Sequence, residues 1–135
     1  MIYVDSSALF KLIWPEPESK ALLAVIADEE LVSSDLLVTE LRRTAVRHAP
    51  PNLQPFKRVL LERADAICSD VDLIPVDTEL LLAAGELEPI SLRSLDAIHI
   101  ASALSAEADG FLTYDRRQSD AARSVGLTVL APVSS

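Results

Sequence analysis

The sequence predicts an α/β domain in which helices cover both faces of a parallel sheet. Three observations support this class. Short apolar runs rich in β-branched residues recur along the chain, and helical segments separate them. The length of 135 residues is also typical of one domain. We therefore expect a single domain over residues 1–135, without repeats or linkers.

The chain begins with a short apolar strand. Residues 2–4, Ile-Tyr-Val, are bulky and consecutive, which favours a strand buried on both faces. A helix is expected from residue 6 or 7 to Trp14, because prolines follow it. Residues 18–30 predict a second helix with a wide apolar stripe, and residues 31–33 predict a second strand.

The middle of the chain continues this alternation. A helix capped by Ser34 or Asp35 is expected to run to about residue 48. Pro55 fits the first turn of the next helix, which should end near residue 68. Residues 73–76 predict a third strand, and its proline indicates an edge position because proline cannot donate a ladder hydrogen bond.

The rest of the chain is expected to contain three helices and two strands. We expect these elements at residues 78–87 (helix), 94–106 (helix), 110–114 (strand), 116–125 (helix) and 128–130 (strand). Asp77 is the expected cap of the first of them, and Gly126 fits the C-terminal cap of the third helix. The helix over 94–106 is apolar almost all round, which predicts that it is buried.

The composition indicates that another chain covers part of the surface. Half of the residues are hydrophobic although only 4% are aromatic, and this surplus suggests a second copy or a different partner. We expect a homodimer and a groove near the first helices that receives an apolar helix. The candidate residues are Phe10, Leu12, Ile13 and Trp14.

The compartment is expected to be the cytoplasm. Cys68 is the single cysteine, so the chain has no internal disulfide, and a reducing environment fits. The longest wholly apolar run, residues 21–27, is too short to span a bilayer. We therefore expect no membrane partner.

The net charge of −9 argues against passive binding to nucleic acid. The basic residues are nevertheless concentrated between residues 42 and 63, where Glu62 is the only acid. This span is either a solvated helix face or a rim that contacts phosphates beside an acidic pocket. Arg43 on the third helix and Arg116, which follows Asp115, are the candidate substrate contacts.

Four acidic side chains occupy unusual positions: Asp5, Glu40, Asp96 and Asp115. Asp5 and Asp115 directly follow apolar strands, so both should lie at the edge of the sheet where ligands bind. Glu40 shares a helix face with two leucines, which directs it towards the core side. Asp96 lies at the start of the apolar helix.

Each acid also has a structural explanation as a helix cap, a helix-dipole acid or the partner of an arginine. A functional site would be absent only if all four acids had purely structural roles. Carboxylates gathered in a partly buried pocket repel one another, so the cluster takes up protons or binds a cation. Oxygen ligands favour Mg²⁺ or Mn²⁺, and such a cation suits phosphodiester hydrolysis.

The sequence lacks the motifs of other common catalytic and cofactor sites. With three glycines in the chain, there is no P-loop, dinucleotide-binding pattern or Gly-x-Ser-x-Gly motif. Two histidines and one cysteine do not give zinc-ligand spacing. His99 could share a face with Asp96, but we interpret it as a core residue or at most a support for the site.

Four segments resemble the PIN-domain family in content, order and spacing. They are Val-Asp-Ser-Ser-Ala-Leu at 4–9, Thr-Glu-Leu at 39–41, Leu-Asp-Ala-Ile-His-Ile-Ala at 95–101 and Leu-Thr-Tyr-Asp at 112–115. Within the family the chain looks like the VapC-type toxins of bacterial toxin–antitoxin pairs, from residue 1 to about residue 130. The resemblance implies a three-layer α/β/α fold around a parallel sheet of four to five short strands.

The resemblance also implies a Mg²⁺- or Mn²⁺-dependent endoribonuclease that a cognate antitoxin inhibits. Carried over by position, the catalytic metal ligands would be Asp5, Glu40, Asp96 and Asp115. Ser6 and Thr113 match polar positions that support the site, and Asp120 is the alternative to the fourth acid. Family members commonly dimerise, and their target is transfer, ribosomal or messenger RNA.

A non-enzymatic signalling or interaction module with an acidic pocket is the alternative. A phosphoacceptor module of this kind would need adjacent acids after the first strand and a lysine after a late strand. Here two serines follow Asp5, and no lysine follows Lys57. The sequence therefore favours the nuclease.

Overall fold

A computed structural model describes residues 1–133 of the chain. Its centre is a parallel sheet with the strand order β3-β2-β1-β4-β5. The strands are β1 (Ile2–Val4), β2 (Leu31–Ser34), β3 (Asp72–Ile74), β4 (Gly110–Leu112) and β5 (Val129–Leu130). The helices are α1 (Ser6–Ile13), α2 (Ser19–Ile26), α3 (Leu36–His48), α4 (Gln54–Ser69), α5 (Thr78–Gly85), α6 (Ser94–Ser105) and α7 (Arg116–Ser124).

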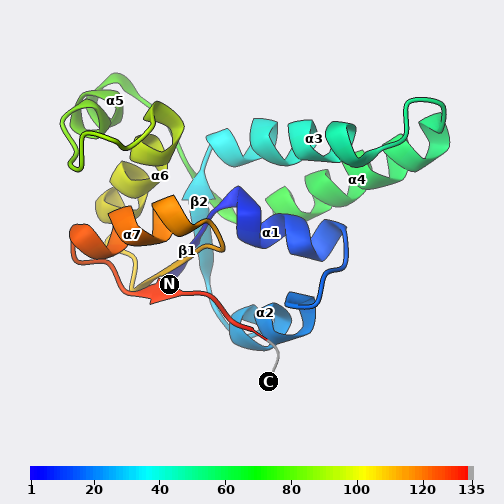
Figure 1. Ribbon diagram of the computed structural model, residues 1–135, viewed down its shortest axis with the longest axis horizontal. Coiled ribbons are helices and arrows are strands. Elements are labelled where there is room, and N and C mark those ends of the chain that lie inside the picture. The colour runs from blue at the N-terminus through cyan, green and yellow to red at the C-terminus, as the bar shows by residue number, and fades with distance from the viewer. Residues whose placement is uncertain (134–135) are drawn as a thin grey trace.

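The central strand β1 sends its side chains to two separate hydrophobic cores. Ile2 and Val4 pack with the buried faces of α1, α2, α3 and α4. Tyr3 points to the opposite face, where its ring stacks on Phe111 and packs with α6 and α7. Helices α1–α4 therefore lie on one side of the sheet and α5–α7 on the other (Figure 1). This is the expected three-layer arrangement.

The element order agrees with the prediction, and proline and glycine act where expected. β3 is an edge strand, and it ends before Pro75. Gly126 follows α7 with a φ of +89°, the left-handed conformation that glycine adopts readily. Helix α2 ends at Ile26 rather than at residue 30, because residues 28–30 are acidic and oppose the negative end of the helix dipole.

The apolar cluster at the end of α1 is largely core, which corrects the expectation that it forms a partner surface. Phe10 and Ile13 are buried against α3 and α4. Trp14 is 36% exposed and packs edge-on against Phe56 of α4, with 5.6 Å between ring centroids. No helix within residues 1–133 is long and apolar enough to cross a membrane.

Candidate active site

Asp5 lies at the end of β1 with its carboxylate buried among three donors. Oδ1 accepts hydrogen bonds from the Ser7 hydroxyl at 2.6 Å and from the Ala8 N–H at 3.1 Å. Oδ2 accepts a hydrogen bond from the hydroxyl of Thr113, which follows β4. The bond from Ala8 makes Asp5 the N-cap of α1. Asp5 is thus a helix cap and a buried acid at the same time.

Burial raises the pKa of the Asp5 carboxyl above its ordinary value. The hydrogen bonds from Ser7 and Thr113 lower the pKa, but they do not offset the loss of hydration. The negative charge of Asp5 is therefore only partly compensated by the protein, which is the condition under which a carboxylate takes up a proton or binds a cation.

The serine that supports Asp5 is Ser7 rather than the expected Ser6. The Ser7 hydroxyl donates to Asp5, and its oxygen accepts the backbone N–H of Tyr114 at 3.0 Å. Ser7 therefore joins the end of β1 to the chain after β4. In the part of the chain that the structure describes, Ser6 makes no side-chain hydrogen bond. Thr113 contacts Asp5 as expected.

Glu40 belongs to a hydrogen-bonded chain that sequence reasoning missed. Its Oε1 lies 2.5 Å from Nε2 of His99, and Nδ1 of His99 lies 2.6 Å from the hydroxyl of Tyr3. Because an ionised carboxylate only accepts, the Nε2–H donates to Glu40. In the neutral imidazole, Nδ1 then accepts from Tyr3. His99 is 2% exposed, so α6 and β1 hold the chain firmly behind Glu40.

Burial also raises the pKa of the Tyr3 hydroxyl. The nearby hydroxyls of Ser33 and Ser102 lower this pKa, whereas the negative charges of Asp5 and Glu40 raise it. Tyr3 therefore stays neutral and keeps the proton that it donates to His99.

Asp96 and Asp115 form the outer part of the acidic region. Burial raises the pKa of the half-buried Asp96, and the charges of Asp115 and Glu40 raise it further. His99 and Arg93 act in the opposite direction. Asp115 is exposed and caps α7, since its Oδ1 accepts the N–H of Gln118 at 2.9 Å.

The alternative acid, Asp120, is exposed and lies 3.9 Å from Arg123. Asp120 lines a cleft together with Asp96, but Asp115 is the charge that raises the pKa of Asp96 most. The electrostatics therefore favour Asp115 over Asp120 as the fourth member of the acidic region.

The acids gather at one edge of the sheet, but not around one point. Across residues 1–133, no three His, Cys, Asp or Glu side chains lie close enough together to ligate one metal ion. The expected close convergence of the four carboxylates is therefore not present in this arrangement. The donors do fit a hard divalent cation by type, because they are carboxylate oxygens and Asp5 lacks full charge compensation. Their role as metal ligands stays a prediction.

The basic residues near the third helix have different environments. Arg42 forms a two-pronged ion pair with Asp65 of α4 at 2.6 and 2.8 Å, and Arg63 donates to the carbonyl of Ile13 at 3.1 Å. These two residues therefore hold helices together. Arg43 and Arg116 are exposed, and within the described residues neither makes a hydrogen bond or an ion pair. Their contact with substrate stays a prediction.

The comparison with known proteins supports the family resemblance. The PIN domain family model matches residues 2–124. The chain is 39% identical over 134 residues to "Ribonuclease VapC46" of Mycobacterium tuberculosis, and the match covers 97% of both proteins.

Two solved structures share the fold. The first is Mycobacterium tuberculosis VapC20, described as a Sarcin-Ricin loop cleaving toxin, with a TM-score of 0.72 and 16% identity over 98% of this chain and 100% of that one. The second is VapBC2 from Rickettsia felis bound to a promoter DNA fragment, with a TM-score of 0.68 and 15% identity over 96% and 98% of the two chains. The chain therefore belongs to the PIN domain family, among relatives named VapC ribonucleases.

Proposed function

We propose that this protein is an endoribonuclease that requires Mg²⁺ or Mn²⁺ and acts as the toxin of a toxin–antitoxin pair in the cytoplasm. The observation that carries the proposal is the acidic edge of the sheet, where Asp5, Glu40, Asp96 and Asp115 come from four different elements. The similarity to VapC46, a ribonuclease by name, supports the activity. VapC20, described as a Sarcin-Ricin loop cleaving toxin, has the same fold.

The carboxylates of Asp5, Glu40, Asp96 and Asp115 do not surround one point in this arrangement, so binding of the cation would have to draw these four side chains together. When bound, a hard divalent cation polarises the phosphoryl oxygen and lowers the pKa of water. The side chains of the protein orient the carboxylates. Ser7 and Thr113 fix the orientation of the Asp5 carboxylate, and His99 holds a proton at Nε2 against Glu40. Both carboxylates are thus oriented before substrate arrives.

Cleavage of RNA tests the proposal. Transfer, ribosomal and messenger RNA would be incubated with the protein in Mg²⁺, in Mn²⁺ and in EDTA. We expect cleavage of at least one RNA in the presence of either metal and none in EDTA. Asp5→Asn and Asp96→Asn should abolish cleavage.

A matched control is Asp28→Asn, which removes the same charge from an exposed turn after α2 and should cleave normally. Circular dichroism would establish that each variant is folded. Undiminished cleavage in EDTA would contradict the metal requirement, and full activity of Asp96→Asn would contradict the assignment of the site.

We propose that the antitoxin binds a groove of about 340 Å³ between α1, α2 and α4. Leu12, Leu23 and Ile26 line it, and Glu29 and Asp70 lie at the same groove. This composition suits an amphipathic helix with basic residues beside its apolar face. The fold of this chain resembles that of a chain in the VapBC2 structure from Rickettsia felis, which is consistent with an antitoxin partner. Leu23→Asp should weaken binding of a protein encoded beside this gene, whereas Val59→Asp, which adds the same charge at another exposed apolar position, on α4, should not.

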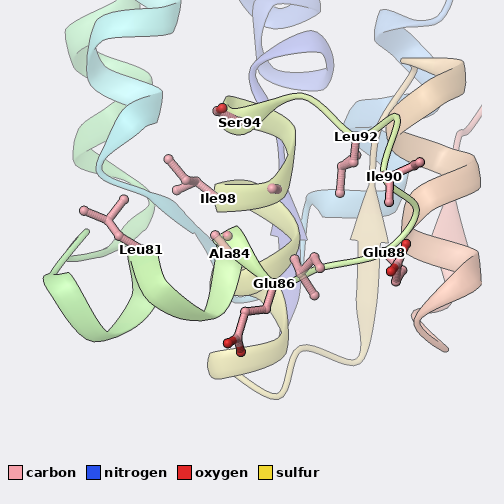
Figure 2. Close-up of a pocket in the computed structure, with 11 residues that line it drawn as sticks. Leu81, Ala84, Glu86, Glu88, Ile90, Leu92, Ser94 and Ile98 are labelled. Carbon is pink, nitrogen blue, oxygen red and sulfur yellow. The ribbon is translucent and has the colours of Figure 1, made fainter.

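We also propose that a second copy covers the face formed by α5 and α6. Leu81, Ile98 and Leu92 line a groove of about 440 Å³ here, and Figure 2 shows them on α5, α6 and the loop between these helices. Ile90 on the same loop is 93% exposed. A groove beside a protruding apolar side chain suits a two-fold interface, where each copy supplies both. Sedimentation should show a dimer, and Leu81→Asp should give a monomer.

A further inference from the structure

A second cleft opens beside the acidic region and contains basic as well as acidic side chains. It has a volume of about 500 Å³ and lies between the loop before α6 and the first turns of α6 and α7. Arg93 and Arg117 line it together with two acids, Asp96 and Asp120. Asp96 is therefore shared between the acidic region and a cleft that contains two guanidinium groups. Volumes of this order are typical of sites that hold a small ligand.

The two arginines are free to bind a ligand. Arg93 and Arg117 are exposed, and within residues 1–133 neither forms a hydrogen bond or a salt bridge. Some other arginines of this acidic protein have partners, as Arg42 has Asp65 and Arg123 has Ser119, whereas Arg43 and Arg116, like these two, have none among the described residues. A planar guanidinium without a partner matches the geometry of phosphate oxygens and can bind them through two hydrogen bonds.

The start of α6 adds positive potential on the same side. Arg93 occupies the N-cap position of this twelve-residue helix, and no side chain caps its first N–H groups. In contrast, Asp5, Asp77 and Asp115 cap α1, α5 and α7 through side-chain hydrogen bonds. An uncapped helix N-terminus is favourable for negative charge. With two arginines against two acids, Asp96 and Asp120, the cleft is less negative than the protein as a whole, which carries a net charge of −9.

We propose that this cleft binds a backbone phosphate of the RNA strand next to the phosphate that is cleaved, through Arg93 and Arg117. The inference rests on the proposed ribonuclease function. Asp96 lies between the two regions, so a strand held at the arginines passes directly into the acidic region. The contact is to phosphate, so it fixes the position of the strand without reading the base sequence.

The test is the binding of a fluorescein-labelled, mixed-sequence 12-nucleotide RNA, measured by anisotropy at several salt concentrations. To prevent cleavage, all proteins would carry Asp5→Asn. Arg93→Gln and Arg117→Gln should each weaken binding about tenfold, because each removes a charge-assisted phosphate contact. Each should also lower the slope of log affinity against log salt by about 0.7, the value for one contact to a single strand.

Lys20→Gln is the matched control, because it removes one exposed positive charge from α2 and should leave affinity and slope unchanged. Unchanged affinity and slope in both arginine variants would overturn the inference. So would weaker antitoxin binding with normal RNA binding, which would assign the arginines to the protein partner.

Cleavage separates this inference from the proposed function. In the protein with Asp5 intact, Arg93→Gln and Arg117→Gln should each raise KM about tenfold and leave kcat nearly unchanged. The reason is that the contact binds the substrate and the transition state equally well. If the unmodified protein cleaves no RNA but the arginine variants still lose binding, the function fails and the phosphate site stands. If the unmodified protein cleaves RNA, and the arginine variants have the same KM and the same RNA affinity as their parent proteins, the function stands and the phosphate site fails.

Discussion

The inner and outer parts of the acidic region are built on different principles. In the inner part, Asp5 and Glu40 are held by buried hydrogen-bond partners, among them Thr113 and His99. In the outer part, Asp96 is half-buried and Asp115 is exposed. The inner part is therefore fixed by the fold before any ligand binds, whereas the outer part is accessible to metal and substrate. Removing the partners that hold the inner acids should therefore lower stability most. Removing an outer acid should lower RNA cleavage with little effect on stability.

The largest effect on stability should come from His99→Leu. This change leaves the Tyr3 hydroxyl and Glu40 without their shared partner in a buried setting, and we expect a loss of about 2 to 3 kcal/mol in the free energy of unfolding. Urea unfolding in EDTA measures it. His48→Leu on the exposed end of α3 is the control, with an expected loss below about 1 kcal/mol. Similar losses in both variants would remove the distinction between the buried hydrogen bonds of His99 and the exposed ring of His48, which only packs beside Phe10 and Trp14 and bonds to its own helix.

Thr113→Val should have the next largest effect. The variant keeps the shape of the side chain but removes the hydroxyl that donates to the buried Asp5 carboxylate, so we expect a loss of about 2 kcal/mol. Ser6→Ala should change stability by less than about 0.5 kcal/mol, because Ser6 does not contact Asp5. Chemical denaturation would separate the two. A large loss for Ser6→Ala and none for Thr113→Val would reverse the assignment of the supporting hydroxyl.

The pH dependence of stability should show a smaller effect of the inner carboxylate. Because the pKa of Asp5 is raised by folding, the folded state binds more protons than the unfolded state between the ordinary and the raised pKa. The stability of the metal-free protein relative to Asp5→Asn should therefore fall as the pH rises through this window and become constant above it. Urea unfolding in EDTA from about pH 4 to pH 8 tests the sign. A relative stability that rises with pH would show that the hydrogen bonds outweigh burial.

The smallest effect on stability should come from the outer part. Asp115→Asn should change the free energy of unfolding by less than about 0.5 kcal/mol relative to the unmodified protein, since asparagine caps a helix about as well as aspartate. RNA cleavage by this variant should nevertheless fall strongly, and Asp120→Asn should cleave normally. The opposite result for the two variants would assign the fourth acidic position to Asp120.

The placement of the acids could be predicted because it follows from local sequence. Asp5 directly follows β1, and Asp115 lies just beyond β4, so the strand pattern alone indicates their edge of the sheet. Glu40 and Asp96 were identified because an acid interrupts an apolar helix face. These signals depend on periodicity within one element, which the sequence displays directly.

The partners of the acids could not be predicted because they depend on packing between distant elements. Tyr3 and His99 are 96 residues apart, and no local pattern indicates that a tyrosine on β1 meets a histidine on α6. The choice between Ser6 and Ser7 depends on the direction of the first turn of α1. Similarly, the apolar character of Phe10 and Ile13 did not indicate whether they face a partner or α3 and α4.

The most direct test of the central claim is calorimetric titration of Mn²⁺ into the purified protein. The account predicts that the unmodified protein and Asp28→Asn bind Mn²⁺ with equal affinity, whereas Asp5→Asn, Glu40→Gln and Asp96→Asn each bind it at least tenfold more weakly. Equal affinities in all five proteins, or no binding to the unmodified one, would contradict the claim that these acids form one metal site.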